Sequence, residues 1–177
     1  MKKLNIAFFK STHGNYQDKI IDLGSGADGY SHCEIVIDAQ TSIGAHYEQN
    51  GVIEYRYNNI YDLDCWDIIE LPIKGSPAKV KAVQMVGTPY DLRGVILYYF
   101  KLKFGASNKA VWCSEMCALC INESEKILDD TLIMPNDLFN ILKNHGGSKI
   151  VKTNSKKKNK NTKNPIIDRF GRISYEQ

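Results

Sequence analysis

Apolar residues follow two different periods along this chain, and the change of period restricts the fold. Up to about residue 73 they alternate with polar residues, as in half-buried strands, in the segments "NIAFFK", "SHCEIVID", "TSIGAHYEQNGVIEYRY" and "DCWDIIELPI". From Ser76 onward the spacing lengthens towards that of helices. Strands first and helices second predict an α+β fold, with an antiparallel meander packed against helices.

Turn residues place the boundaries of these elements. Asn50-Gly51 divides two alternating runs and predicts a hairpin turn, because both residues tolerate positive φ. Three helices are predicted: one from Ser76 or Pro77 that Gly87 and Pro89 end, one at "CSEMCALCINESEKIL", and one from Pro135 to Gly146-Gly147. The glycine-broken segment "GNYQDKIIDLGSGADGY" is expected to be a short helix or a loop.

The charge of the chain is unevenly distributed. The 177 residues contain 23 Lys and Arg and 20 Asp and Glu, and residues 151–177 hold eight of the basic and two of the acidic ones. Residues 1–150 are therefore mildly acidic and long enough for one domain, and residues 151–177 are expected to be a Lys/Asn-rich linker with a short C-terminal tail. A basic run without interleaved aromatic residues does not favour nucleic-acid binding.

No targeting or membrane segment is predicted. The apolar stretch from Leu4 to Phe9 is shorter than the roughly 7–15 apolar residues of a signal peptide, and Lys101 interrupts the longest apolar run. We therefore expect a cytoplasmic protein whose five cysteines are thiols. A virus-encoded protein, or one released by lysis, is the alternative.

The stretch "AVWCSEMCALC" places Cys113, Cys117 and Cys120 in a C-x3-C-x2-C spacing. A radical-SAM cluster is disfavoured because on a helix the first and last of these residues are about 10 Å apart along the axis. A structural zinc site is disfavoured because a second ligand pair is missing. We interpret Cys117 and Cys120 as core residues. Cys113 opens the helix, where the helix dipole and unpaired N–H groups stabilise a thiolate.

A cysteine nucleophile needs a base, and the sequence contains four histidines: His13, His32, His46 and His145. His145 lies beside a Gly-Gly helix end and His13 in a glycine-broken segment, so both are expected at the surface. His32 opens a strand, and a strand can hold an imidazole rigidly against a thiolate. Cys113 and His32 are thus the candidate nucleophile and base.

Three motifs in this order resemble a known family: "YSHCEIVI", then "GTPYDLRG", then "WCSEMC". They are similar to the circularly permuted, YiiX-like branch of the NlpC-type papain-fold cysteine peptidases and amidases, which is related to lecithin retinol acyltransferase-like proteins. The resemblance spans about residues 5 to 145. It implies a permuted papain-like fold with the histidine strand before the cysteine helix, and places Tyr90 near the nucleophile.

The third catalytic member in this family is a polar residue on the strand after the histidine. An odd-numbered turn at 38–40 puts His46 or Glu48 on the face of His32, whereas a two-residue turn puts Tyr47 there, with Glu54 opposite it. Our order of preference is His46, Glu54, Glu48. Some relatives carry Glu where this chain has Gly44.

These patterns together predict a thiol hydrolase, either a peptidase or amidase or an acyltransferase, that acts through a thioester and requires no metal or organic cofactor. The resemblance implies as substrate a peptide, peptidoglycan, or an acyl amide or ester. Ser114 and Glu115 are expected to be structural. A non-catalytic binding or host-interaction protein on the same fold is the alternative.

Overall fold

The computed structural model describes residues 3–13, 29–56, 63–100, 109–150, 165–167 and 173–175. Within them the chain is an α+β protein built on a six-stranded antiparallel sheet. Its strands are β1 (Leu4–Lys10), β2 (Tyr30–Val36), β3 (Thr41–His46), β4 (Gly51–Arg56), β5 (Trp66–Leu71) and β6 (Ser148–Ile150). The order across the sheet is β4-β3-β2-β1-β5-β6.

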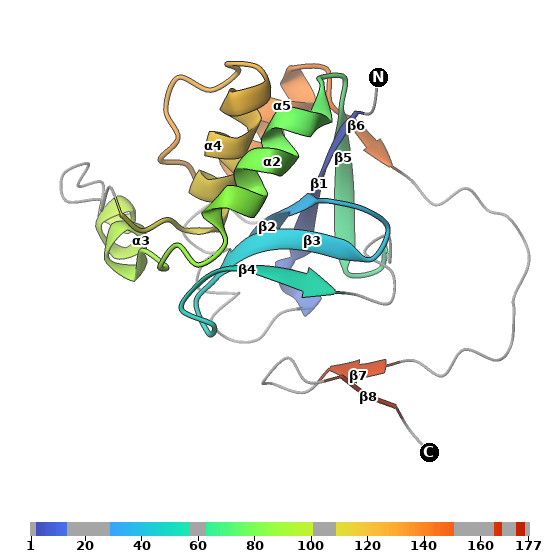
Figure 1. Ribbon diagram of the computed structural model, residues 1–177, viewed down its shortest axis with the longest axis vertical. Coiled ribbons are helices and arrows are strands. Elements are labelled where there is room, and N and C mark those ends of the chain that lie inside the picture. The colour runs from blue at the N-terminus through green and yellow to red at the C-terminus, as the bar shows by residue number, and fades with distance from the viewer. Residues whose placement is uncertain are drawn as a thin grey trace, which may run out of the picture.

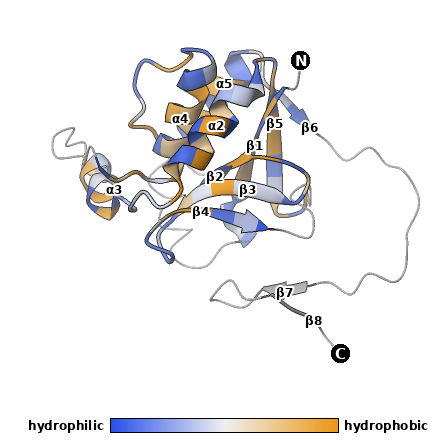
Figure 2. Cartoon of the chain, viewed as in Figure 1, coloured by the Kyte–Doolittle hydropathy of each residue, from blue (hydrophilic) through white to orange (hydrophobic). Residues whose placement is uncertain are grey.

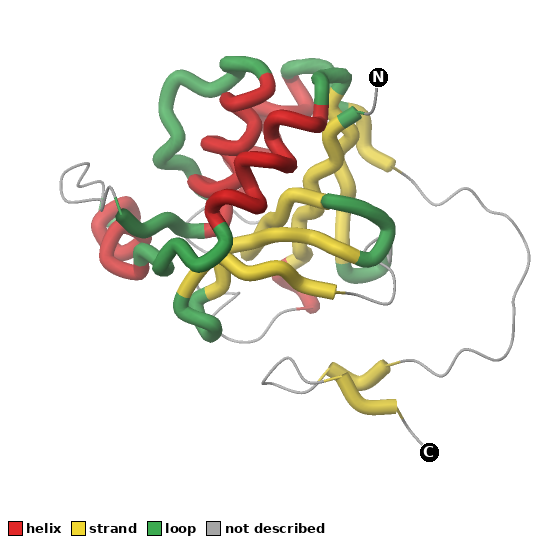
Figure 3. The backbone as a smooth tube through the Cα atoms, in the orientation of Figure 1, coloured by secondary structure: helices red, strands yellow, loops and turns green. Residues whose placement is uncertain are grey.

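Three helices cover one face of this sheet (Figures 1 and 3), namely α2 (Gly75–Met85), α4 (Cys113–Ser124) and α5 (Pro135–Asn144). A fourth helix, α3 (Leu92–Tyr99), lies to one side of them. A short 3-10 helix, η1 (Ser11–His13), follows β1. Among the described residues, no helix is both long and apolar enough to cross a membrane.

The main core lies between the helices and the sheet, where Figure 2 shows hydrophobic segments on α2 and α4. One face of each strand contributes alternate residues, as period-two patterning predicts. Fully buried members from β1 to β3 and from α4 include Ile6, Phe8, Cys33, Ile35, Ile43, Met116, Cys117, Cys120 and Ile121. A smaller cluster on the opposite face contains Ala7, Val36, Trp66 and Ile68.

The predicted elements are largely present, but their arrangement differs from a simple meander. β1 to β4 follow one another in the sheet, whereas β5 returns to pair with β1, with Ile6 opposite Ile69. β1 is therefore an interior strand of the sheet, paired with β2 along one edge and with β5 along the other. The prediction did not include α3 as a separate helix, nor β6.

The turn between β3 and β4 is also longer than predicted. Tyr47 to Asn50 form a four-residue turn, His46 pairs with Gly51, and only Asn50 has a positive φ, of 54°. Gly51 begins β4, and a Cβ there would lie 2.5 Å from the carbonyl oxygen of Thr88. Gly51 therefore permits a close backbone approach and does not form the turn.

Two predicted segments lie partly or wholly outside the described residues. The described part of the chain omits 14–28, which contains most of the glycine-broken segment, and 151–164, which contains the Lys/Asn-rich linker. At the C-terminal end, β7 (Pro165–Ile167) and β8 (Ile173–Tyr175) pair with each other as an antiparallel ribbon.

Candidate active site

Cys113 is the first residue of α4, as predicted. It follows Trp112, whose extended backbone (φ −101°, ψ 175°) forms the N-cap position, and its side chain is 4% exposed. The N–H groups of the first helical turn have no partner within the helix, because the first intrahelical bond is donated by Met116 to Trp112. These N–H groups and the helix dipole favour negative charge on the sulfur.

A backbone N–H from the sheet also points at this sulfur. Within β2 and β3, the ladder pairs only Ile35 with Ile43 and Val36 with Ser42. The N–H of Ile37 points towards β3 and donates to the carbonyl of Thr41. N–H directions alternate along a strand, so the N–H of Cys33 also points towards β3. It donates to the Sγ of Cys113. The sulfur thus takes the place of an acceptor on β3.

His32 connects Cys113 to a buried carboxylate. Its ring is hydrogen-bonded to Cys113, and its Nε2 lies 3.0 Å from the Oε1 of Glu34. Glu34 is fully buried and its pKa is held far below its usual range, because its contacts with His32 and His46 outweigh the opposing effect of burial. An ionised carboxylate only accepts hydrogen bonds, so the His32 Nε2 carries a proton. Nδ1 is then the ring atom left to exchange a proton with Cys113.

The pKa shifts of the pair agree with this geometry. Burial opposes charge on His32, but hydrogen bonds to Cys113 and Glu34 and their negative charges raise its pKa well above the usual range. For Cys113, a hydrogen bond from the Cys33 thiol, together with the hydrogen bond and charge of His32, outweighs burial and lowers its pKa well below the usual range. Both shifts favour the charged forms, a thiolate on Cys113 and an imidazolium on His32.

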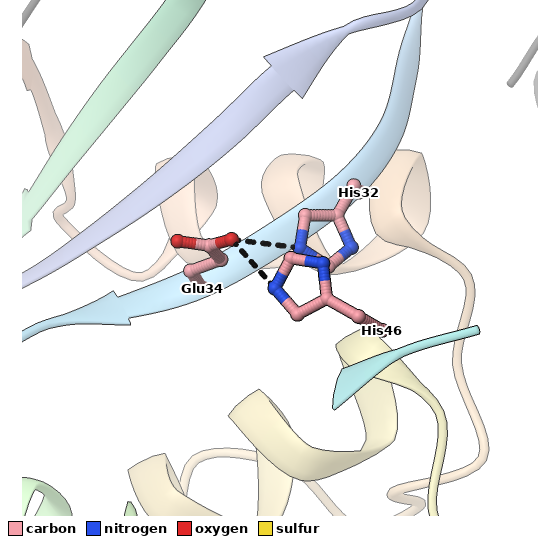
Figure 4. A group of neighbouring side chains, drawn as sticks. All are labelled: His32, Glu34 and His46. Atoms are coloured by element: carbon pink, nitrogen blue, oxygen red, sulfur yellow. Dashed lines mark hydrogen bonds and ion pairs between the residues drawn. The ribbon is translucent and has the colours of Figure 1, made fainter. Parts of the chain in front are cut away.

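His46 lies beside His32 across the β2–β3 hairpin. Val36 faces Ser42 and the intervening turn is odd-numbered, so His46 shares the face of His32, as that turn length predicts. The two ring centroids are 4.4 Å apart. Figure 4 shows both imidazoles directed at one oxygen of Glu34, and the Nε2 of His46 is also 3.0 Å from that Oε1. The Ser42 hydroxyl donates to the other oxygen, Oε2.

Gly44 leaves the space in which these side chains meet. A Cβ at this position would lie 2.7 Å from the Cγ of Glu34 and 3.2 Å from the Nε2 atoms of His32 and His46. A larger side chain at this position would collide with all three, and the carboxylate of the site comes from Glu34 on the neighbouring strand β2.

Gly44→Ala is expected to destabilise the fold by about 1–3 kcal/mol, because the methyl group overpacks a buried site. The same crowding should displace Glu34 from His32 and slow alkylation of Cys113. Thermal unfolding and a timed iodoacetamide reaction measure the two effects. An unchanged unfolding temperature and alkylation rate would contradict this packing.

The other predicted third members do not join the site. Glu54 pairs opposite Ile43 and not Tyr47; its side chain is 46% exposed and forms an ion pair with Arg56 at 3.5 Å. Its position differs from the prediction because the four-residue turn shifts the β3–β4 register. Glu48 is exposed in that turn. Tyr47 is 51% exposed.

The backbone of Tyr90 lies beside the segment that precedes Cys113. It forms a parallel bridge with Val111, two residues before Cys113, and its ring makes an edge contact with Tyr47 at 5.9 Å. The segment that contains it is fixed to β4, since Tyr90 donates its N–H to Asn50. This places its backbone beside the strand that leads into α4.

The remaining candidates have structural positions. Cys117 and Cys120 are fully buried in the core, and the exposed residues His13 and His145 lie in η1 and at the C-cap of α5. The hydroxyl of Ser114 donates to Ile133. Glu115 accepts the N–H of Trp112, and burial, together with Asp91 and Asp130, raises its pKa to about 7.

Two residues of the site were not predicted from the sequence. Glu34 follows His32 at i+2 on a strand, and this spacing alone places both on one face. Cys33 gave no such signal, because its contact with Cys113 depends on where α4 docks. Among the described residues, His32, Glu34 and His46 also form the group that could hold a metal ion.

Comparisons with protein-family models, with curated proteins and with solved structures found no match to this chain.

Proposed function

We propose that this protein is a thiol hydrolase of the permuted papain-like, NlpC-type group, in which Cys113 is the nucleophile and His32 the general base. The observation that carries the proposal is the continuous series of contacts from Cys113 through His32 to Glu34. A nucleophile, its base and a group that orients the base are the three parts that covalent catalysis by cysteine requires.

In the proposed reaction the Cys113 thiolate attacks the carbonyl carbon of an amide or ester. The leaving amine or alcohol takes its proton from the His32 imidazolium, and a thioester remains on Cys113. His32 then removes a proton from water, which attacks the thioester, releases the carboxylic acid and restores the thiolate. If an acyl acceptor replaces water, the same steps give transfer.

Backbone N–H groups at the start of α4 are the proposed oxyanion donors. Those of Cys113 and Ser114 precede the first intrahelical hydrogen bond and are adjacent to the reacting sulfur. Tyr90 is a second proposed contributor, because its segment adjoins the strand that leads into α4. Glu34 orients His32, and neither Glu34 nor His46 has a direct role in the bond changes.

The expected result of a substrate screen is hydrolysis of at least one class among peptides, muropeptides and acyl esters, and its loss by at least about 1,000-fold in Cys113→Ala. Cys117→Ala is the matched control, since that cysteine is buried one turn later on the same helix. Equal activity of the two variants would disprove the assignment.

A binding protein on the same fold predicts a different result. It would show slow and similar alkylation of Cys113 and Cys117 and no turnover of any substrate in the screen. The lowered pKa of Cys113 favours the hydrolase, because a binding surface has no need of a buried thiolate.

A further inference from the structure

His32 and the two side chains behind the proposed dyad, Glu34 and His46, converge in a way that orienting His32 does not require. The Nε2 atoms of His32 and His46 each lie 3.0 Å from a single oxygen of the fully buried Glu34. One histidine is enough to hold the carboxylate, and one carboxylate is enough to orient His32. The second imidazole needs another explanation.

The Nε2 of His46 is buried and has no hydrogen-bond partner, although it lies close to Glu34. A buried nitrogen without a hydrogen-bond partner is costly, so such atoms usually have a ligand or a function. A metal ion would bind the lone pair of this nitrogen.

The spacing of the three atoms suits one small ion. All three ligand atoms lie within 4.8 Å of one another, and Gly44 leaves the space at which they converge. Zinc bonds to His nitrogen and carboxylate oxygen are about 2.0–2.2 Å long, so two ligands of one ion lie roughly 3–3.5 Å apart. The separations of 3.0 Å from each nitrogen to Oε1 agree with this value.

The types of ligand atom in the site determine which metal ions it suits. Two imidazoles and one carboxylate suit zinc and similar transition metals, whereas magnesium and calcium prefer oxygen ligands alone. The hydroxyl of Ser42 holds the second oxygen of Glu34, as a supporting hydrogen bond does in metal sites. Both histidine side chains are 17% exposed, which leaves an approach for the ion and a place for water.

We propose that His32, Glu34 and His46 form a binding site for Zn²⁺ or a similar divalent transition metal, and that this ion inhibits the thiol chemistry of Cys113. The inhibition rests on the proposed function; the binding does not. The ion would replace the protons on both Nε2 atoms, so Glu34 could no longer orient His32 as a base. The proton on Nε2 and the ion are thus alternatives on the same imidazole, and His32 forms no imidazolium beside Cys113 while the ion is bound.

Binding is tested in tag-free Cys113→Ala protein, which removes the reactive thiol from the measurement. Titration with Co²⁺ is expected to give a visible absorption band at one equivalent, and calorimetry with Zn²⁺ a single site. His46→Gln should weaken Zn²⁺ binding by at least about 100-fold. His145→Gln is the matched control, because that exposed histidine also lies near an acid, Glu125, at 3.9 Å.

Zinc binding that survives His46→Gln, or that is absent from the parent protein, would overturn the site. Circular dichroism of each variant verifies folding, and Glu34→Gln provides a second ligand variant. In the wild type, one equivalent of Zn²⁺ should slow Cys113 alkylation at least about tenfold, and a chelator should restore it. Zinc binding that leaves the alkylation rate unchanged would overturn the proposed inhibition but not the binding site. Neither failure affects the hydrolase proposal, which substrate turnover tests.

Discussion

His32→Ala is expected to slow alkylation of Cys113 at pH 6 by about 30-fold, in buffer that contains a metal chelator. Without the imidazolium, burial opposes the hydrogen bonds from Cys33, and we expect Cys113 to return to about its ordinary pKa. Such a cysteine is about 0.3% thiolate at this pH, roughly 300-fold less than a fully ionised one. The more basic thiolate is intrinsically a better nucleophile by about tenfold, which offsets part of the loss. The result isolates the contribution of His32 to the charge on the sulfur.

The pH profile distinguishes this effect from a change in access. The wild-type rate should be flat from pH 6 to 8, because the pKa of Cys113 lies well below its usual range. In His32→Ala the rate should rise about tenfold per pH unit over the same interval. His145→Ala, at an exposed histidine, should match the wild type. A variant profile that is flat but uniformly slower would indicate altered access and contradict the ion pair.

Cys33 makes a second contribution to the thiolate. The hydrogen bond from its thiol is the largest cause of the lowered pKa of Cys113, and its own pKa is raised by burial and by contact with Cys113 and Cys117. Cys33→Ala should therefore shift the alkylation profile of Cys113 to higher pH while the backbone N–H remains. An unchanged profile would show that the backbone and His32 are sufficient.

The sequence predicted the elements better than their arrangement. Period-two alternation placed His32 and His46 on one face once the turn length was known, and helix spacing placed Cys113 at the start of α4. Alternation carries no information on strand order, so the pairing of β5 with β1 was not predicted.

The site was incompletely predicted for a related reason. Residues i and i+2 of a strand share a face, so the sequence places Glu34 on the face of His32. A buried carboxylate is costly unless it is paired, so Glu34 was not expected in the interior while its partners were unknown. The contact of Cys33 with Cys113 arises where β2 and β3 stop pairing, and this is determined by how α4 packs. Local patterns fix the face of a residue, whereas packing determines which faces meet.

Glu34→Gln is expected to lower stability at pH 7 by about 2–3 kcal/mol, even though the amide has nearly the same shape. The buried carboxylate accepts from Ser42 and lies against two imidazoles, and loss of one member leaves a buried charge uncompensated. An amide retains part of the hydrogen bonding, which keeps the loss at the lower end of such values. Thermal unfolding should fall by roughly 4–12 °C.

The pH dependence of this loss has a defined sign. The pKa of Glu34 is lower in the folded than in the unfolded chain, so its contribution is complete above the unfolded value of about 4.3 and is lost as the pH falls below it. The wild type and Glu34→Gln should therefore converge in stability towards pH 3. Unfolding by urea at pH 7, 5 and 3 measures the convergence.

Glu54→Gln provides the matched control. Glu54 lies on β4 in an ion pair with Arg56, whose side chain is 82% exposed, and such surface pairs contribute about 0–1 kcal/mol. Its substitution should change stability little at any pH, because both charges remain hydrated in the folded and unfolded chain. Equal effects of Glu34→Gln and Glu54→Gln would show that the buried carboxylate does not hold the two histidines, and the orienting role of Glu34 would then be wrong.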